Sequence, residues 1–281
     1  MTYYSTLKKS KLTKKHYENF PVATLLFPKK IRDAATILYQ FARSGDDIAD
    51  EGSLSTKERL KQLNHYQHSL DQIKKNNLNV EPLFMDIYKV IRRYHMPITL
   101  LQKFIDAFKQ DITIGRYPNY KAVSAYCDKA ASPAGEMILS LFTMNSKKNI
   151  RYSNSLCQAL ALIGMSQDFH VDILKNRLYI PMDEMKRFNL KIVDIQNKQF
   201  TNNWKIFKKF WLNRIELLLK SGSPLGEHLN GRLALQIRIL IAAAHILVNR
   251  MKQDNCNLFN NPPTLSKIDW FLIFCRCILS K

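Results

Sequence analysis

The stretch Arg43-Ser-Gly-Asp-Asp-Ile-Ala-Asp-Glu51 is the most informative part of this chain, together with its counterpart Gln167-Asp-Phe-His-Val-Asp172. The aspartates spaced four residues apart are Asp46 and Asp50 in the first stretch and Asp168 and Asp172 in the second. Residues at i and i+4 share a helix face, so each pair would present its carboxylates side by side. Like charges so placed repel by about 0.2–0.5 kcal/mol. We therefore expect the four aspartates to be the ligands of one cation, and Mg²⁺ is the favoured cation.

The alternative interpretation is that these pairs are ordinary solvent-exposed surface residues. If the chain had only one such pair, this interpretation would be favoured. Basic neighbours argue for a site instead, because Arg43 precedes the first pair, and Lys175 and Arg177 follow the second. Carboxylates that hold a metal beside Arg or Lys form a typical clamp for a diphosphate group.

Composition predicts an all-α protein. The 281 residues are 46% hydrophobic, enough for a large core, and contain only 8 Gly and 10 Pro, which favours long regular elements. Apolar residues recur at three- and four-residue spacing in helix-length segments. These segments are 31–48, 57–74, 83–94, 100–112, 122–144, 155–174, 204–219, 231–251 and 265–279. We expect one domain over residues 1–281, with a flexible basic tail at 1–15 and a mobile polar connection at 186–203.

Other features narrow the class of protein. The chain has no secretory signal, no run of apolar residues long enough for a membrane span, and no CxxC pair among its five cysteines. Segment 233–248, the most apolar, is expected to be a core helix, since Arg238 interrupts it. A phosphate loop, G-x-G-x-x-G, H-E-x-x-H and G-x-S-x-G are also missing, so the chemistry must come from the carboxylates. We expect a cytoplasmic protein that is a monomer or a weak dimer.

The chain is strongly basic, with a formal net charge of +20 and a pI near 9.7, so two kinds of anionic partner have to be considered, nucleic acid and lipid. Nucleic acid is not expected, because the chain has no zinc-finger spacing, RNP-like string or basic heptad region. The lysine cluster at 8–15 is a candidate for peripheral contact with anionic lipid at the inner face of the cytoplasmic membrane. The alternative for that cluster is a solubilising tail.

Five segments together resemble one known family. Residues 39–51 closely resemble the first aspartate-rich motif of the squalene and phytoene synthase family. Residues 167–172, followed by Asn176-Arg-Leu-Tyr-Ile-Pro181, resemble the second. Three supporting segments fall in the family order: His16-Tyr-Glu-Asn-Phe20, Arg116-Tyr117, and Tyr126-Cys127 with Ala131-Ser-Pro-Ala-Gly135. Within the family, the chain is most similar to the bacterial hydroxysqualene synthase branch of hopanoid pathways.

The resemblance implies an isoprenoid synthase fold, a helical bundle around a central cavity for prenyl chains with the diphosphate and Mg²⁺ at its mouth. It implies a transferase or lyase that ionises a prenyl diphosphate, here converting presqualene diphosphate to hydroxysqualene with release of diphosphate. The alternatives are head-to-head condensation of two farnesyl diphosphates, as in squalene, dehydrosqualene or phytoene synthases, and a non-catalytic homologue.

Residue roles follow from the resemblance. Mg²⁺ would be held by Asp46, Asp50, Asp168 and Asp172, which with Tyr126 form the expected catalytic set. The expected substrate-binding residues are His16, Tyr39, Arg43, Gln167 and Arg177. Tyr39, Phe41 and Tyr126 could stabilise a carbocation through their ring faces, although core packing is the favoured role for Phe41. An exposed histidine without a role is the alternative for His16.

Two positions depart from the family pattern. Much of the family has an Asn four residues before the first Asp of the second motif and a Gln three residues before that Asn. Here those positions are Gly164 and Ala161. The loss of two polar side chains from the pocket could change how the diphosphate or a water is held, or could accompany reduced activity.

Overall fold

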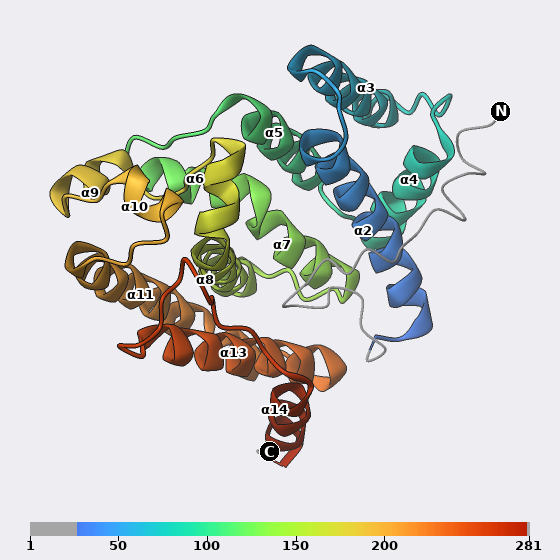
Figure 1. Ribbon diagram of the computed structural model, residues 1–281. Helices are drawn as coiled ribbons and strands as arrows, with labels where there is room; N and C mark the ends of the chain where they lie inside the picture. The colour runs from blue at the N-terminus through green and yellow to red at the C-terminus, as the bar shows by residue number, and fades with distance from the viewer. Residues whose placement is uncertain (1–26, 280–281) are drawn as a thin grey trace.

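The computed structural model describes residues 27–279, and within them the chain is a succession of helices joined by short loops (Figure 1). The helices are α2 (Lys29–Asp50), α3 (Thr56–Lys74), α4 (Pro82–Tyr94), α5 (Thr99–Thr113), α6 (Tyr120–Ala130), α7 (Ser132–Leu141), α8 (Lys147–Asp172), η1 (Ile173–Lys175), α9 (Met182–Arg187), α10 (Ile192–Gln196), α11 (Asn202–Gly222), α12 (Leu225–His228), α13 (Gly231–Lys252) and α14 (Lys267–Leu279). Over these residues β-type pairing is limited to an isolated bridge between Arg116 and Leu178. The all-α prediction is confirmed. His16 and the basic segment 1–15 lie outside the described residues.

Helix α8 lies at the centre of the bundle, where it contacts α6, α7, α11 and α13 (Figure 1). Its start is fixed by Ser146, whose side chain accepts a hydrogen bond from the backbone N–H of Asn149. Further along, the indole Nε1 of Trp211 on α11 donates to Ser166 Oγ at 2.8 Å, and both residues are buried. A central buried helix held in this way gives the second aspartate-rich segment a rigid support.

Helices α2, α5 and α7 contact one another and form the part of the bundle beside the first aspartate-rich segment. The approach of α2 to α5 requires a glycine, because a Cβ added at Gly45 would collide with the ring of Phe108. Gly45 immediately precedes Asp46 in the chain. The same close packing that brings α5 against α2 therefore fixes where the first aspartate pair begins.

The predicted helix boundaries were wrong at several places; α8, for example, begins at Lys147 and not at 155, and two further differences are larger. The single helix expected over 122–144 is two helices, because α6 ends and the chain bends at Ala131, with φ −122° and ψ −48°. Pro133, in the first turn of α7, has no N–H with which to continue the hydrogen bonding of α6. Segment 186–203, expected as a mobile connection, contains the end of α9 and all of α10. Asp194 in α10 anchors it by accepting a 3.0 Å hydrogen bond from Trp204 Nε1.

In the described part of the chain, α13 is the one helix long and apolar enough to cross a membrane. It packs against α8, α11, α12 and α14, and Leu247, Val248 and Met251 on it are fully buried. This packing matches the expected core helix, since the core helix of a bundle has the same length and composition as a membrane span.

Candidate active site

The two aspartate-rich segments meet at the ends of α2 and α8. Arg177 joins them: its Nη1 and Nη2 donate to the two carboxylate oxygens of Asp50 at 2.8 Å each, and Nη2 lies 3.5 Å from Asp172 Oδ1. Lys175 adds a third contact, with its Nζ 2.9 Å from Asp50 Oδ2. Asp50 and Asp172 thus share one guanidinium, although they belong to helices far apart in the sequence.

A short turn after α8 directs Arg177 back towards α2. Asn176 adopts the left-handed conformation, with φ 56°, and the Arg177 N–H then bonds to the Asp172 carbonyl at 2.9 Å. The next residue, Leu178, donates its N–H to the Gly115 carbonyl at 2.9 Å. A Cβ added at Gly115 would collide with the Asn176 carbonyl oxygen, so this contact requires a glycine.

The C-terminal ends of α2 and α8 add negative electrostatic potential to the site. Asp50 is the last residue of α2 and Asp172 is the last of α8, where the helix dipoles place partial negative charge. The last turn of α2 carries no basic side chain of its own. Arg59 from α3 partly compensates, because its Nη1 donates to the Ile48 carbonyl at 2.6 Å. Additional cations are therefore needed where the carboxylates gather.

The pKa values show which carboxylates lack such compensation. For Asp50, burial favours the neutral form, but the hydrogen bonds from Arg177 and Lys175 outweigh it and lower the pKa. Burial raises the pKa of Asp172 to about 7 against the opposing charge of Arg177, and Asp168 raises it further. Burial, and next the charge of Asp50, raise the pKa of Asp46 above its ordinary value. Burial is thus the main reason why the charged forms of Asp46 and Asp172 are disfavoured, whereas the basic neighbours of Asp50 keep it ionised.

The aspartates fit a divalent cation in donor type and in charge, since hard cations prefer carboxylate oxygens. Within residues 27–279, however, no three side chains of His, Cys, Asp or Glu lie close enough together to form a metal cluster. Arg177 and Lys175 are the groups that contact Asp50. The assignment of four aspartates as Mg²⁺ ligands stays a prediction.

An apolar cavity of about 260 Å³ begins beside the first segment, between α2, α5 and α7. Its lining residues are Ala35, Leu38, Tyr39, Ala42, Arg43, Asp46, Phe104, Phe108, Ala134, Met137 and Ile138. At the polar end, Arg43 lies 3.2 Å from Asp46 and 2.6 Å from Asp47. The rings of Phe104 and Phe108 are stacked, with centroids 6.0 Å apart. The apolar lining suits part of a hydrocarbon chain, and Arg43 at one end suits a charged head group.

Phe41 packs in the core, which was its favoured role. It is fully buried, and its ring centroid lies 5.8 Å from that of Tyr66 and 6.1 Å from that of Phe84. Tyr39 lines the cavity, whereas Tyr126 is not among its lining residues, and a role of either ring in stabilising a carbocation stays a prediction.

The structure adds Asp111 and Tyr179, which were not predicted from the sequence. Asp111 accepts hydrogen bonds from Tyr126 Oη at 3.0 Å and from Tyr179 Oη at 3.2 Å. Burial raises the pKa of Asp111 to about 6, against the hydrogen bond from Tyr126. The sequence contains a signal that could have identified Asp111. Phe104, Phe108 and Asp111 are spaced four and three residues apart, so they share one face of α5. Phe104 and Phe108 line the apolar cavity, whereas Asp111, Tyr126 and Tyr179 are not among its lining residues.

Gln167 and Gly164 complete the set of residues singled out from the sequence. Gln167 is buried, and its amide Nε2 donates to the Pro263 carbonyl at 2.7 Å. This contact holds the loop before α14 and does not support substrate binding, which stays a prediction. A Cβ added at Gly164 would meet nothing within 4 Å, so the position one turn before Asp168 borders open space.

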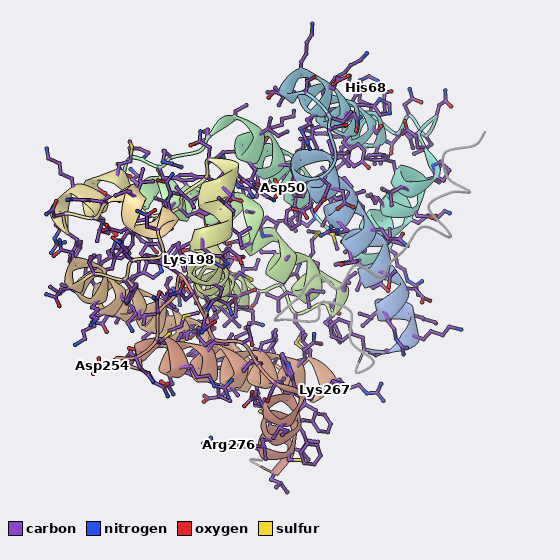
Figure 2. The ribbon with its side chains drawn as sticks, viewed as in Figure 1. Asp50, His68, Lys198, Asp254, Lys267 and Arg276 are labelled. Atoms are coloured by element: carbon purple, nitrogen blue, oxygen red, sulfur yellow. The ribbon has the colours of Figure 1, made fainter. Side chains whose placement is uncertain are left out.

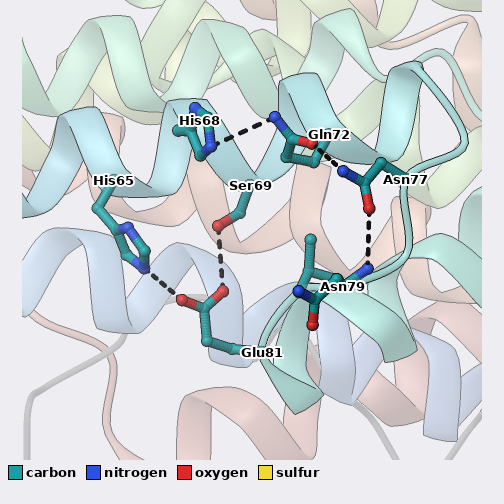
Figure 3. Close-up of a pocket in the computed structure, with 8 residues that line it drawn as sticks. His65, His68, Ser69, Gln72, Asn77, Asn79 and Glu81 are labelled. Carbon is teal, nitrogen blue, oxygen red and sulfur yellow. Dashed lines mark hydrogen bonds and ion pairs between the residues drawn. The ribbon is translucent and has the colours of Figure 1, made fainter.

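A larger hollow, of about 540 Å³, lies on α3 and the loop that follows it, and shares no lining residue with the apolar cavity (Figure 3). Its side chains bond to one another: Glu81 accepts from Ser69 at 3.1 Å and contacts His65, while Gln72 contacts His68 at 3.3 Å. Because none of the four aspartates lines it, the hollow is separate from the candidate active site.

Comparisons with known proteins give a consistent result. Residues 13–269 match the family model described as squalene/phytoene synthase. A hydroxysqualene synthase of Zymomonas mobilis is 33% identical over 172 residues, which is 60% of this chain and 56% of that protein. The chain thus spans little more than half the length of this relative. A hydroxysqualene synthase of Sinorhizobium fredii is 27% identical over 84% of this chain and 80% of its own length.

Among solved structures, a squalene synthase from Alicyclobacillus acidocaldarius superposes with a TM-score of 0.77. It is 24% identical, and the match covers 85% of this chain and 90% of that one. At this identity the likeness establishes the fold.

Proposed function

The chain belongs to the squalene/phytoene synthase family, and on that premise we propose that it is an Mg²⁺-dependent enzyme that ionises a prenyl diphosphate. The proposed reaction converts presqualene diphosphate to hydroxysqualene and releases diphosphate. The observation that carries the proposal is the junction of Asp50 and Asp172 through Arg177, at the end of α2 that also borders the apolar cavity. The hydroxysqualene synthases of Zymomonas mobilis and Sinorhizobium fredii, to which the chain is similar, support the choice of product.

Binding of the diphosphate would use the basic groups that now contact the aspartates. Arg43, Lys175 and Arg177 bring nitrogen donors to the polar end of the cavity, and a guanidinium binds phosphate oxygens through two parallel hydrogen bonds. Mg²⁺ held by Asp46, Asp50, Asp168 and Asp172 would neutralise the charge that develops on the leaving diphosphate.

Departure of the diphosphate breaks a C–O bond, and the electron pair leaves with the oxygen. The carbocation that remains would lie in the apolar cavity, where Tyr39, Phe104 and Phe108 present ring faces. Each ring face stabilises a nearby cation by about 0.5–2 kcal/mol. The apolar walls would keep water away from the part of the cation that contacts them, and so would delay the quenching that ends the rearrangement.

Hydroxysqualene forms when one water adds to the rearranged carbocation and loses a proton. Asp111 would accept that proton: its pKa of about 6 suits a general base near neutral pH, and it lies near Arg177, although it does not line the apolar cavity itself. Tyr126 and Tyr179 would relay the proton and orient the water through the hydroxyls that they donate to Asp111. In this scheme Tyr126 is catalytic, as expected from the sequence.

Two alternatives have specific support. Head-to-head condensation of two farnesyl diphosphates fits the family description equally well, because both chemistries begin with ionisation at the same site. A non-catalytic homologue, which binds the diphosphate without turnover, is favoured by Ala161 and Gly164, where the polar pocket residues of much of the family are missing.

Incubation of the purified protein with Mg²⁺ and either presqualene diphosphate or farnesyl diphosphate, followed by mass spectrometry of the extracted lipids, tests the proposal. We expect an alcohol from presqualene diphosphate and no change in farnesyl diphosphate. Consumption of farnesyl diphosphate would assign a condensing synthase instead, and no product from either substrate would assign a non-catalytic homologue.

The controls remove the metal or one carboxylate. Chelation by EDTA should abolish diphosphate release, and Asp168→Asn should reduce it by at least about a hundredfold. Asp86→Asn is the matched substitution, because Asp86 is an exposed carboxylate on α4 that pairs with Lys89. It should leave turnover unchanged.

A further inference from the structure

Helix α14 has apolar side chains on two opposite faces. One face packs against α13, where Ile273 and Cys277 are buried. The other consists of Ile268, Phe271, Leu272, Cys275, Ile278 and Leu279, at spacings of one and three residues that keep them on one side of the helix. We call this second face the outer stripe of α14.

The outer stripe is exposed to an unusual degree. Phe271 is 66% exposed, Ile268 71% and Leu279 83%, and Leu272 on the same side is 58% exposed. Single exposed hydrophobic residues are common on protein surfaces, but a contiguous apolar stripe marks a contact with another molecule or with a membrane. Figure 1 shows α14 below α13 at the edge of the bundle.

The charges around the outer stripe are positive. Lys267 and Arg276 are exposed and lie at the two ends of α14 (Figure 2). The acidic residue in the helix, Asp269, is neutralised by Arg250, which donates to its two carboxylate oxygens at 3.0 and 2.6 Å. An apolar stripe bordered by Lys and Arg is the pattern of a helix that lies in the surface of an anionic membrane.

We propose that the outer stripe of α14 docks this protein on an anionic lipid bilayer. The helix lies in the plane of the membrane surface, with Phe271, Leu272 and Ile268 among the acyl chains and Lys267 and Arg276 against phosphate groups. A second copy of the chain is the less suitable occupant, because it carries the same formal charge of +20 and would bring the same basic residues face to face.

The outer stripe of α14 lies apart from the candidate active site. In Figure 2, Asp50 lies in the upper half of the molecule and Arg276 at the bottom, so the outer stripe of α14 and the aspartates lie in different parts of the molecule. The exposure and the charge of the outer stripe support docking independently of the proposed function. The proposed function adds a reason for it, since the long apolar chains of a prenyl diphosphate substrate and of an alcohol product such as hydroxysqualene both partition into a membrane.

Co-sedimentation of the full chain with lipid vesicles tests the proposal without any substrate. We expect binding to vesicles of phosphatidylcholine with phosphatidylglycerol, weaker binding to phosphatidylcholine alone, and weakening of the first by salt. The double variant Phe271→Asp/Leu272→Asp should bind the anionic vesicles at least about tenfold more weakly. Its turnover of detergent-dispersed prenyl diphosphate should equal that of the wild type.

The matched control is Ile206→Asp/Leu217→Asp on α11, which replaces two other exposed apolar residues, 50% and 67% exposed, and changes the net charge equally. It should bind like the wild type. If the α14 variant is unfolded by circular dichroism, Lys267→Gln/Arg276→Gln replaces it and should lose the preference for anionic lipid.

Three outcomes would overturn the proposal. The first is that the wild type binds neither kind of vesicle, and the second is that the folded α14 variant binds as well as the wild type. The third is a dimer, detected by light scattering, that the α14 variant converts to a monomer, which would assign the outer stripe to a second copy. Because no outcome depends on turnover, a failure of docking is distinguishable from a failure of the proposed function.

Discussion

Arg177 donates hydrogen bonds of 2.8 Å to both carboxylate oxygens of Asp50, in an arrangement that also leaves it 3.5 Å from Asp172. The side chain of Arg177 is only 12% exposed. One buried guanidinium thus holds together the ends of α2 and α8, and it does so at the place where a diphosphate would bind.

Replacement of Arg177 by Met should lower both stability and activity. Removal of one partner leaves the buried carboxylates unpaired, which costs about 2–3 kcal/mol of the free energy of unfolding, below the usual range for buried pairs because Asp50 keeps some exposure. Urea unfolding monitored by circular dichroism measures the loss. Lys89→Met, which breaks the exposed Lys89–Asp86 pair, should cost less than about 1 kcal/mol. Equal losses in the two variants would contradict a special role for Arg177.

The Tyr126→Phe substitution should separate the catalytic role of the hydroxyl from the role of the ring in core packing. The substitution keeps the buried ring but removes the hydroxyl that donates to Asp111 at 3.0 Å. We expect a fall in kcat of about a hundredfold with a KM within about twofold, since general acid–base groups contribute at least that much to rate. Tyr94→Phe removes a hydroxyl that bonds to the Lys30 carbonyl, away from the cavity, and should leave both constants unchanged. A fall in the Tyr94 variant alone would contradict the assignment.

Asp111 should make stability depend on pH. Burial raises its pKa from 3.8 to about 6, so the folded protein binds this proton more tightly than the unfolded chain. The contribution of Asp111 to the free energy of unfolding is therefore greatest below pH 3.8 and decreases as the pH rises to about 6. Above pH 6 the free energy of unfolding stays about 3 kcal/mol lower than at acidic pH. Asp111→Asn should remove this decrease. Urea unfolding at a series of pH values measures it, and an unchanged slope in the variant would contradict the account.

Much of the site was predictable because its signals are local. The four-residue spacing of Asp46 and Asp50 and the helical periodicity around them require no knowledge of the rest of the fold. Asp111 was missed because its neighbours are Tyr126 and Tyr179, which approach it only in the folded chain. The bend at Ala131 was missed because the apolar periodicity of 122–144 continues across it, whereas backbone hydrogen bonding does not.

Gly164 and Gly115 offer a pair of substitutions with opposite outcomes. A Cβ at Gly164 meets nothing within 4 Å, so Gly164→Asn should change the free energy of unfolding by less than about 0.5 kcal/mol. Gly115→Ala should cost about 1–3 kcal/mol, because its Cβ would collide with the Asn176 carbonyl oxygen.

The product of the Gly164→Asn variant is the informative readout. An amide beside Asp168 restores the polar side chain that much of the family has at this position, and it would compete for the water that quenches the cation. We expect a smaller share of alcohol and a larger share of hydrocarbon or unreacted substrate in the lipid extract. An unchanged product ratio would exclude a role for the open space at Gly164 in the reaction.

Binding of inorganic diphosphate by isothermal titration calorimetry, with and without Mg²⁺, tests most directly the claim that the two aspartate-rich segments form one site. The comparison is a double-mutant cycle of wild type, Asp50→Asn, Asp172→Asn and the double variant. We predict Mg²⁺-dependent binding by the wild type and a coupling of about 1 kcal/mol or more between the two substitutions, because residues that share partners are not additive. Binding without Mg²⁺ that is unaffected by either substitution, or losses that add within about 0.3 kcal/mol, would contradict a shared site.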